Sequence, residues 1–333
     1  MDKRKPLLVW LLITIFSLGL LEAAACVYYF QKGPSESAFA LGHIFRGLTR
    51  TIISRRGPTK SQIEPVHIND DTFGWTPRAN LRLVVDCPNS TPTYTTDSAK
   101  RRFIPKPKDP AGRILFLGDE ITFGHCVSDN EVYPSILARW YWKNWEVQNQ
   151  AVTGWGTTQA FIALSAVMRT EKVPSMVIYG MIPDHIERNY LRRTWLSKHT
   201  AKGRQHPYFE LINDELVFKG LAELSSALGD GPELRRKEHA ITFQYLSAMH
   251  QMCHEKQIPF IVVFLPPAGS YPLSLINKLY DSGVLALDLT ELKYDGGQTA
   301  AENYISPDGH RMIAASIADS FVSKLLITNG TGG

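Results

Sequence analysis

The clearest pattern along the chain is an apolar run that ends in polar and glycine residues. The run Arg-Ile-Leu-Phe-Leu at 113–117 is followed directly by Gly118, Asp119 and Glu120. A short apolar run bounded by turn residues is typical of a parallel strand that is buried on both faces. Open α/β sheets place their ligand sites at the carboxyl ends of such strands. The sequence therefore predicts a functional edge just beyond residue 117.

From residue 113 onward, short apolar runs alternate with helical patterns. Such alternation predicts βαβ units and a parallel sheet. We expect an α/β fold of three layers, αβα, with helices on both faces of about five parallel strands. The expected strands cover 113–117, 146–149, 175–180, 260–265 and 285–289, and the expected helices cover 132–143, 157–170, 237–255, 272–281 and 307–325.

An insertion at 188–236 interrupts this alternation. Within it, two alternating runs flank Asn213-Asp214 over 208–218, which predicts a β-hairpin. Insertions beyond the carboxyl edge of a sheet tend to cover the site, so we expect a lid or a partner-docking element. The basic residues here are expected on a solvated face rather than against an anionic partner. They are Arg188, Arg192, Arg193 and Lys198.

The N-terminus carries the pattern of a membrane anchor. Lys3, Arg4 and Lys5 precede a nearly uninterrupted apolar run over 6–30, and spanning a bilayer needs about 20 apolar residues. A transmembrane helix is favoured over a cleaved signal peptide or a lipoprotein signal ending at Cys26, because the run continues past the candidate cleavage site. The basic residues favour a cytoplasmic N-terminus, which would place the main domain outside the cytoplasm, in the periplasm of a bacterium.

Two segments join this anchor to the α/β domain. Residues 38–53 could form a basic amphipathic helix that lies on the membrane surface or on a partner, or that packs on the domain. The following turn-rich sequence contains short candidate strands at 81–85 and 93–96. We therefore expect a tail and anchor at 1–31, a juxtamembrane segment at 32–60, a small β-rich lead-in at 61–110 and the α/β domain at 111–327.

The composition excludes two classes of protein. Of the 333 residues, 44% are hydrophobic and 11% are aromatic, which is sufficient for a packed core and argues against a disordered chain. The net charge of +4 is small for this length, and the Lys and Arg residues are scattered. Nucleic-acid binding is therefore not expected.

Three motifs in order along the chain resemble those of the SGNH (GDSL) hydrolase superfamily. They are Gly118-Asp119-x-x-Thr122-Phe123-Gly124, the segment 149–159 that contains Gly154, and Ser306-Pro307-Asp308-Gly309-His310 at the start of the last helix. The resemblance covers about residue 70 to the C-terminus and implies the flavodoxin-like SGNH hydrolase fold. The anchored arrangement is similar to SGNH-like proteins of bacterial envelopes, some of which act in polysaccharide acetylation.

The chemistry of that family requires a serine nucleophile, a histidine, an aspartate and an oxyanion hole built from a backbone amide, a glycine and an asparagine. The corresponding positions in this chain hold Glu120, Gly154, Pro183, Ala301 and Tyr304. Only Gly154 matches. A carboxylate is not a hydroxyl nucleophile, proline has no N–H donor, and tyrosine titrates near pH 10 rather than near 7. The resemblance therefore implies a pseudoenzyme-like domain.

Three functions are compatible with the residues at these positions. The preferred one is a catalytically inactive SGNH-like domain that serves, with a protein partner and no cofactor, as a structural or binding subunit of a membrane or envelope assembly. The second is an extracytoplasmic esterase or O-acyltransferase acting on a polysaccharide or another ester through a non-standard site, with His310 as a shifted histidine. The third is metal or Cys-His chemistry at Glu120, His125, Cys126, Asp184 and His185, although their spacing matches no known metal motif. The pocket candidates are Asp119, Glu120, His125, Gly154, Asp184, His185 and Tyr304.

Two smaller features add expectations. Cys87 and Cys126 could form a disulfide outside the cytoplasm, whereas Cys26 and Cys253 suit solitary thiols. The aromatic residues at 140–142, beside Trp145, favour packing in the core and along a helix over a platform for a glycan.

Overall fold

The computed structural model separates Gln62–Gly333 as a compact unit from the residues before it. The predicted anchor, the juxtamembrane segment and Ala301 lie outside the described residues. Within the described part, no helix combines the length and the apolar character needed to cross a bilayer. The structure describes residues 66–87, 90–170, 172–190, 192–193, 205–222, 232–266, 271–293 and 304–330.

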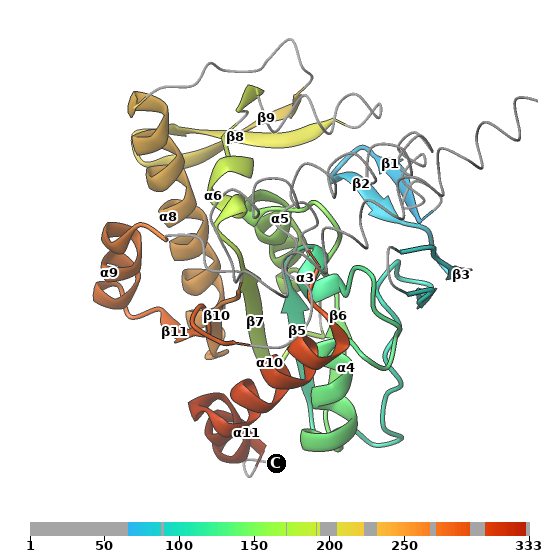
Figure 1. Ribbon diagram of the computed structural model, residues 1–333. Coiled ribbons are helices and arrows are strands. Elements are labelled where there is room, and N and C mark those ends of the chain that lie inside the picture. The colour runs from blue at the N-terminus through green and yellow to red at the C-terminus, as the bar shows by residue number, and fades with distance from the viewer. Residues whose placement is uncertain are drawn as a thin grey trace, which may run out of the picture. The chain divides into compact units, whose positions relative to one another are not determined.

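A five-stranded parallel sheet forms the centre of the described part, in the order β11-β10-β7-β5-β6 (Figure 1). Numbered from β5 along the chain, this order is the 2-1-3-4-5 of flavodoxin-like folds, and the prediction of a parallel α/β sheet is confirmed. The three inner strands are almost wholly apolar because both of their faces are covered. The strands are β5 (Arg113–Leu117), β6 (Glu146–Asn149), β7 (Met176–Met181), β10 (Phe260–Phe264) and β11 (Leu285–Asp288).

Helices cover both faces of this sheet (Figure 1). Successive strand side chains point to opposite faces, so Leu115 and Val177 pack on one side and Ile114 and Ile178 on the other. The first face carries α5 (Thr157–Met168), α8 (Pro232–His254) and α9 (Leu273–Asp281), and the second carries α4 (Tyr133–Ile136), α10 (Pro307–Asp319) and α11 (Phe321–Gly330). The three-layer arrangement predicted from the sequence is therefore present.

Two predicted helices are divided in the structure. The helix expected at 307–325 breaks at Ser320, whose extended backbone ends α10 and whose Oγ accepts a hydrogen bond from the Val322 N–H of α11 at 3.2 Å. Serine is a favoured residue for such a cap. The helix expected at 132–143 continues from α4 as a π-helical turn, η1 (Leu137–Tyr141), in which the Trp142 N–H donates to the Leu137 carbonyl at 2.7 Å.

The lead-in consists of two short antiparallel pairs, β1 (His67–Asp70) with β2 (Gly74–Pro77) and β3 (Arg82–Val84) with β4 (Thr93–Thr95). The second pair matches the predicted strands, whereas the first was not predicted. Its turn is set by Asp70, whose Oδ1 accepts from the backbone N–H groups of Thr72 and Phe73 at 3.0 and 3.1 Å.

Cys87 and Cys126 form a disulfide that ties the lead-in to the loop after α3 (Glu120–Phe123). Of the two outcomes open for this pair, the disulfide is thus the one observed, and Cys253 is a buried free thiol. Buried Arg102 reinforces the connection, since it donates to Asp129 Oδ1 at 2.6 Å and lies 4.2 Å over the Tyr94 ring.

The insertion contains the predicted hairpin, formed by β8 (His206–Ile212) and β9 (Glu215–Ala222). Asn213 and Asp214 at its turn have φ values of 52° and 62°, as two-residue hairpins require. The Phe209 ring packs 5.5 Å from Phe161 on α5 and 5.7 Å from Tyr245 on α8. The hairpin is therefore seated on the α5–α8 face of the domain.

Candidate functional site

The candidate site begins at the carboxyl end of β5. Gly118 has a φ of +151°, and a Cβ there would lie 2.5 Å from Thr122 Oγ1, so only glycine fits. Asp119 caps α3, because its Oδ1 accepts from the Ile121 N–H at 3.0 Å. Glu120 is thus the first residue of α3 and lies at the edge where the sequence predicts the site.

The Glu120 carboxylate is bound on both of its oxygens. Its Oε2 accepts from the Gly154 N–H at 3.0 Å, a donor that a φ of +82° at this glycine directs toward the site. Arg188 on α6 (Asp184–Arg188) supplies Nη2 to Oε1 at 2.8 Å and Nη1 to Oε2 at 3.2 Å. Such a forked guanidinium–carboxylate pair is among the stronger polar interactions in proteins.

Arg188 connects Glu120 to the rest of the site. Its Nη1 also donates to the Trp155 carbonyl at 2.7 Å and lies 3.4 Å from Asp119 Oδ2. The side chains of Arg188, Asp119 and Glu120 are only 4%, 0% and 7% exposed. Two carboxylates therefore share one guanidinium almost out of contact with solvent. Asp184, one helical turn earlier, is 54% exposed and lies at the rim, 3.7 Å from Arg188 Nη2.

A second chain of contacts runs from Asp119 into the α5 face. His185 Nε2 lies 3.0 Å from Asp119 Oδ2, and the Tyr179 hydroxyl lies 2.6 Å from His185 Nδ1. The same hydroxyl donates to Thr157 Oγ1 at 3.0 Å. His185 is fully buried, so neither ring nitrogen faces solvent. Nδ1 has the Tyr179 hydroxyl as its partner, whereas Nε2 lies close to Asp119 without a well-directed hydrogen bond.

The charges of the site follow from these contacts. Burial alone would raise the pKa of Glu120, but the Arg188 charge and the backbone N–H groups outweigh it and lower that pKa to about 2. Burial raises the pKa of Asp119, and the neighbouring Glu120 charge adds to this rise against the opposing effects of His185 and Arg188. The pKa of Arg188 is raised, because the two carboxylates outweigh its loss of hydration. At neutral pH, Glu120 and Arg188 therefore form a permanent ion pair.

The structure brings together four of the seven predicted pocket residues: Asp119, Glu120, Gly154 and His185. His125 instead contacts the lead-in, with Nδ1 3.4 Å from the Tyr94 hydroxyl, and burial lowers its pKa. The remaining two are Asp184, which is at the rim, and Tyr304, which is half-buried ahead of the cap of α10.

Arg188 corrects a sequence-based prediction. It was expected on a solvated face, whereas it is buried and pairs with Glu120. The burial of Arg188 could have been predicted from the charges at the site, where carboxylates were expected but no cation was assigned. A carboxylate at the end of an apolar strand needs a cation, and Arg188 stands at helical spacing from Asp184, which was already a candidate.

The Cys-His hypothesis is wrong. His125 Nε2 lies 3.6 Å from Cys126 Sγ, but that sulfur is bonded to Cys87 and cannot act as a thiolate. As for a metal, the described residues contain no group of three or more His, Cys, Asp or Glu side chains arranged to hold an ion.

His310 occupies a structural position. Its ring is fully buried, stacks against Tyr133 at 6.0 Å and accepts a hydrogen bond at Nδ1 from the Tyr133 N–H at 3.3 Å. Burial, with the charge of Arg102, lowers the pKa of His310 from 6.5 to about 3. The neutral ring therefore holds α10 against α4.

This lowered pKa predicts an acid-sensitive fold. Between pH 6.5 and about 3 the unfolded chain binds a proton at His310 that the folded chain does not, so stability falls as the pH is lowered, by up to about 1.4 kcal/mol per pH unit. Denaturant unfolding at pH 7, 6 and 5 should show a shallower pH dependence for His310→Gln than for wild type. His254→Gln, at an exposed site, is the control, and equal slopes for wild type and His310→Gln would contradict the prediction.

Comparison with known proteins identifies similar structures but no similar sequence. No family model matches the chain, and no curated protein matches it. A lipolytic protein of the G-D-S-L family from Desulfitobacterium hafniense is 16% identical with a TM-score of 0.39, covering 62% of this chain and 97% of its own. The psychrotrophic esterase EstA from Pseudoalteromonas is 14% identical with a TM-score of 0.41, covering 64% and 98%. The SGNH-hydrolase family esterase AlinE4 is 13% identical with a TM-score of 0.33, covering 66% and 99%.

Two of these three structures carry the names G-D-S-L or SGNH, the superfamily that the three sequence motifs resemble. At these identities and TM-scores the likeness carries no conclusion about activity.

Proposed function

We propose that this chain is a catalytically inactive, SGNH-hydrolase-like domain that is held at a membrane by its N-terminal segment and acts as a structural or binding subunit of an envelope assembly. The observation that carries the proposal is the contact between the Gly154 N–H and the Glu120 carboxylate. In the family that the chain resembles, this glycine would donate to the oxyanion formed during ester cleavage. Here an anion of the protein itself already accepts from that donor.

The ion pair makes this occupation permanent. Because the pKa of Glu120 is about 2, lowering the pH within the physiological range would not release it. An ester carbonyl could reach the Gly154 N–H only if the buried Glu120–Arg188 pair separated. Removing one partner of a buried ion pair costs about 3–5 kcal/mol, because the other charge is left buried and unpaired. Displacing one partner with a neutral carbonyl would carry a similar free-energy cost.

The alternative, an esterase or O-acyltransferase with a non-standard site, is favoured by one observation. Asp119 and His185 lie 3.0 Å apart, as an orienting carboxylate and a general base would. Against this, His185 is fully buried and its other nitrogen faces the Tyr179 hydroxyl. The pair also has no hydroxyl nucleophile next to Asp119, where Glu120 stands. The inactive-domain proposal is therefore the better supported one.

Two features support a position outside the cytoplasm. The apolar run over 6–30 follows three basic residues, and Cys87 and Cys126 are joined in a disulfide, which is typical of oxidising compartments. With the main domain there, a partner in the same membrane is the expected neighbour.

Isolation of the full chain from its native membrane in a mild detergent tests the proposed subunit role. We expect a stable complex of fixed stoichiometry on gel filtration. The hairpin side chain Phe218, which is 52% exposed, offers a variant, and Tyr280 on α9, 53% exposed, offers a matched control. Phe218→Glu should release the partner and Tyr280→Glu should not. A wild-type protein that elutes alone would contradict the subunit role.

A further inference from the structure

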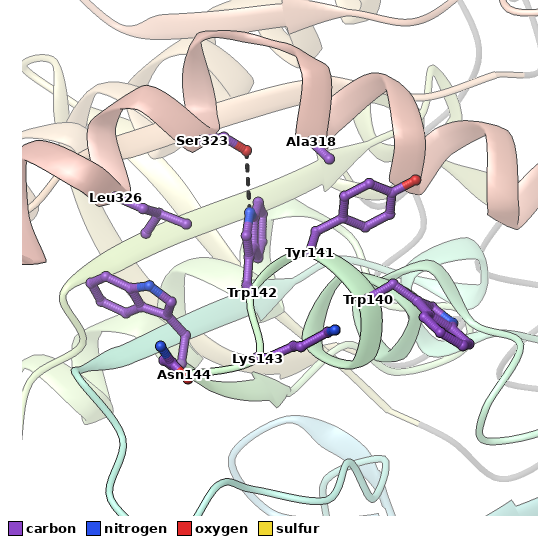
Figure 2. A pocket seen from close by; sticks show the side chains of 9 residues that line it. Trp140, Tyr141, Trp142, Lys143, Asn144, Ala318, Ser323 and Leu326 are labelled. Atoms are coloured by element: carbon purple, nitrogen blue, oxygen red, sulfur yellow. Dashed lines mark hydrogen bonds between the residues drawn. The ribbon is translucent and has the colours of Figure 1, made fainter.

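A hollow of about 630 Å³ lies away from the Glu120 site (Figure 2). One wall is residues 140–145, and the other is Ala318 of α10 with Ser323 and Leu326 of α11. Residues 142–145 lead directly into β6, so the hollow lies near the amino ends of the parallel strands. The Glu120 site is at the opposite, carboxyl edge of the same sheet.

The floor of the hollow is rigid. Trp142 is 5% exposed, and its indole N–H donates to Ser323 Oγ at 3.2 Å, which links the segment before β6 to α11 (Figure 2). The backbone N–H of Trp145 donates to the backbone carbonyl of Trp142 at 2.9 Å. The hollow is therefore a formed concavity, held by one hydrogen bond between distant segments and one local turn.

The opening of the hollow carries exposed aromatic rings. Tyr141 is 47% exposed and reaches toward Ala318, whereas Trp140, 60% exposed, is turned away from Trp142 (Figure 2). The prediction that this cluster serves for packing thus holds for Trp142 and is wrong for these two rings. The guanidinium of Arg139 lies 5.1 Å over the Trp140 ring. Contiguous exposed apolar surface can mark a ligand-binding groove.

Polar groups accompany the rings. Lys143 and Asn144 are exposed and line the hollow, and none of its nine lining residues is acidic. Arg139, over the Trp140 ring, adds a second positive charge nearby. Two acidic residues adjoin the lining in sequence: exposed Asp319 next to Ala318, and Glu146 next to Trp145, whose carboxylate pairs with Arg113 at 3.4 Å. The balance of charge at the opening is positive, which suits a ligand with carboxylate groups.

We propose that this hollow binds a saccharide chain that bears carboxylate groups. The C–H face of a sugar ring, which is partially positive, packs on the electron-rich face of Tyr141. Asn144 offers an amide for sugar hydroxyls, and Lys143 offers an ammonium for a carboxylate. The volume lies within the range of about 300–1,000 Å³ that is usual for small-ligand sites. A membrane surface is the rival occupant, but a rigid concavity with an amide in its wall fits a discrete ligand better than a lipid plane.

The site does not depend on the state of Glu120, so its test is separate from that of the proposed function. Full-length protein, in a detergent without a sugar head group, is titrated with a short oligogalacturonate by calorimetry. Tyr141→Ala and Lys143→Glu should each lower the affinity about tenfold or more. Tyr141→Phe, which keeps the ring, should stay within about twofold of wild type, and so should the distant control Tyr280→Ala.

Three outcomes would overturn the inference. The first is no binding of oligogalacturonate by wild-type protein. The second is binding without the proposed specificity: Tyr141→Ala and Lys143→Glu leave the affinity for oligogalacturonate unchanged, or a neutral malto-oligosaccharide binds as tightly as oligogalacturonate. The third is a lipid contact: in nanodiscs with brominated lipids, fluorescence quenching that Trp140→Phe removes would identify the surface as membrane-facing.

Discussion

Arg188→Ala should lower the free energy of unfolding by about 3–5 kcal/mol, because it leaves two buried carboxylates without their cation. Arg188 contacts Glu120 at 2.8 Å and Asp119 at 3.4 Å, and it also donates to the Trp155 carbonyl at 2.7 Å. These acceptors are almost fully buried, so little solvent could replace the guanidinium. Denaturant unfolding of the full-length protein at pH 7, followed by circular dichroism, measures the effect.

Two further variants make this prediction specific. Arg311 is 60% exposed and pairs with Asp308 on the surface of α10, so Arg311→Ala should change stability little. The double variant Glu120→Gln/Arg188→Met removes one charge of each sign and should recover part of the loss, because the two sites are coupled. If Arg188→Ala matched Arg311→Ala, the buried ion pair would not hold the site together.

The sheet could be predicted from the sequence because its strands are local signals. Each inner strand is a short apolar run bounded by turn residues, and the alternation with helices leaves few ways to order parallel strands. The predicted limits of the strand at 146–149 match β6, and the hairpin turn at Asn213-Asp214 is where the sequence places it. Both patterns depend on residues that are neighbours in the chain.

The divided helices could not be predicted in the same way. Residues 307–325 keep an apolar periodicity across Ser320, and the break becomes visible only when its side chain caps α11. Residues 137–141 have an ordinary helical composition, and their π-helical turn accompanies the burial of Trp142 against α11. Tertiary packing determines both the break at Ser320 and the π-helical turn. The hydrophobic periodicity of one segment carries no information about the tertiary packing of that segment.

The candidate site was half predictable. The motif after β5 placed Asp119 and Glu120, and the second motif placed Gly154, because the carboxyl ends of parallel strands share one edge. Arg188 was missed because it is 68 residues from Glu120 and its burial depends on the position of α6. The sequence predicts an inactive site from Glu120, whereas only the structure shows which groups hold its carboxylate.

The second large effect concerns catalysis. Loss of one member of a catalytic triad typically lowers the rate by about four to six powers of ten. The proposed function takes Glu120 to stand at the nucleophile position, and its carboxylate is bound to Arg188 and Gly154. We therefore expect no turnover of an acetyl ester above the background rate. Glu120→Ser should not restore it, because the hydroxyl would lie beside the Arg188 guanidinium, and Tyr304 stands where the resemblance would place the histidine.

The most direct test is acetyl-ester turnover by purified full-length protein, with p-nitrophenyl acetate and an acetylated oligosaccharide as substrates, beside Glu120→Ala prepared in the same way. The account predicts that both proteins give the rate of the detergent buffer alone. Robust hydrolysis by the wild-type protein that Glu120→Ala abolishes would contradict it.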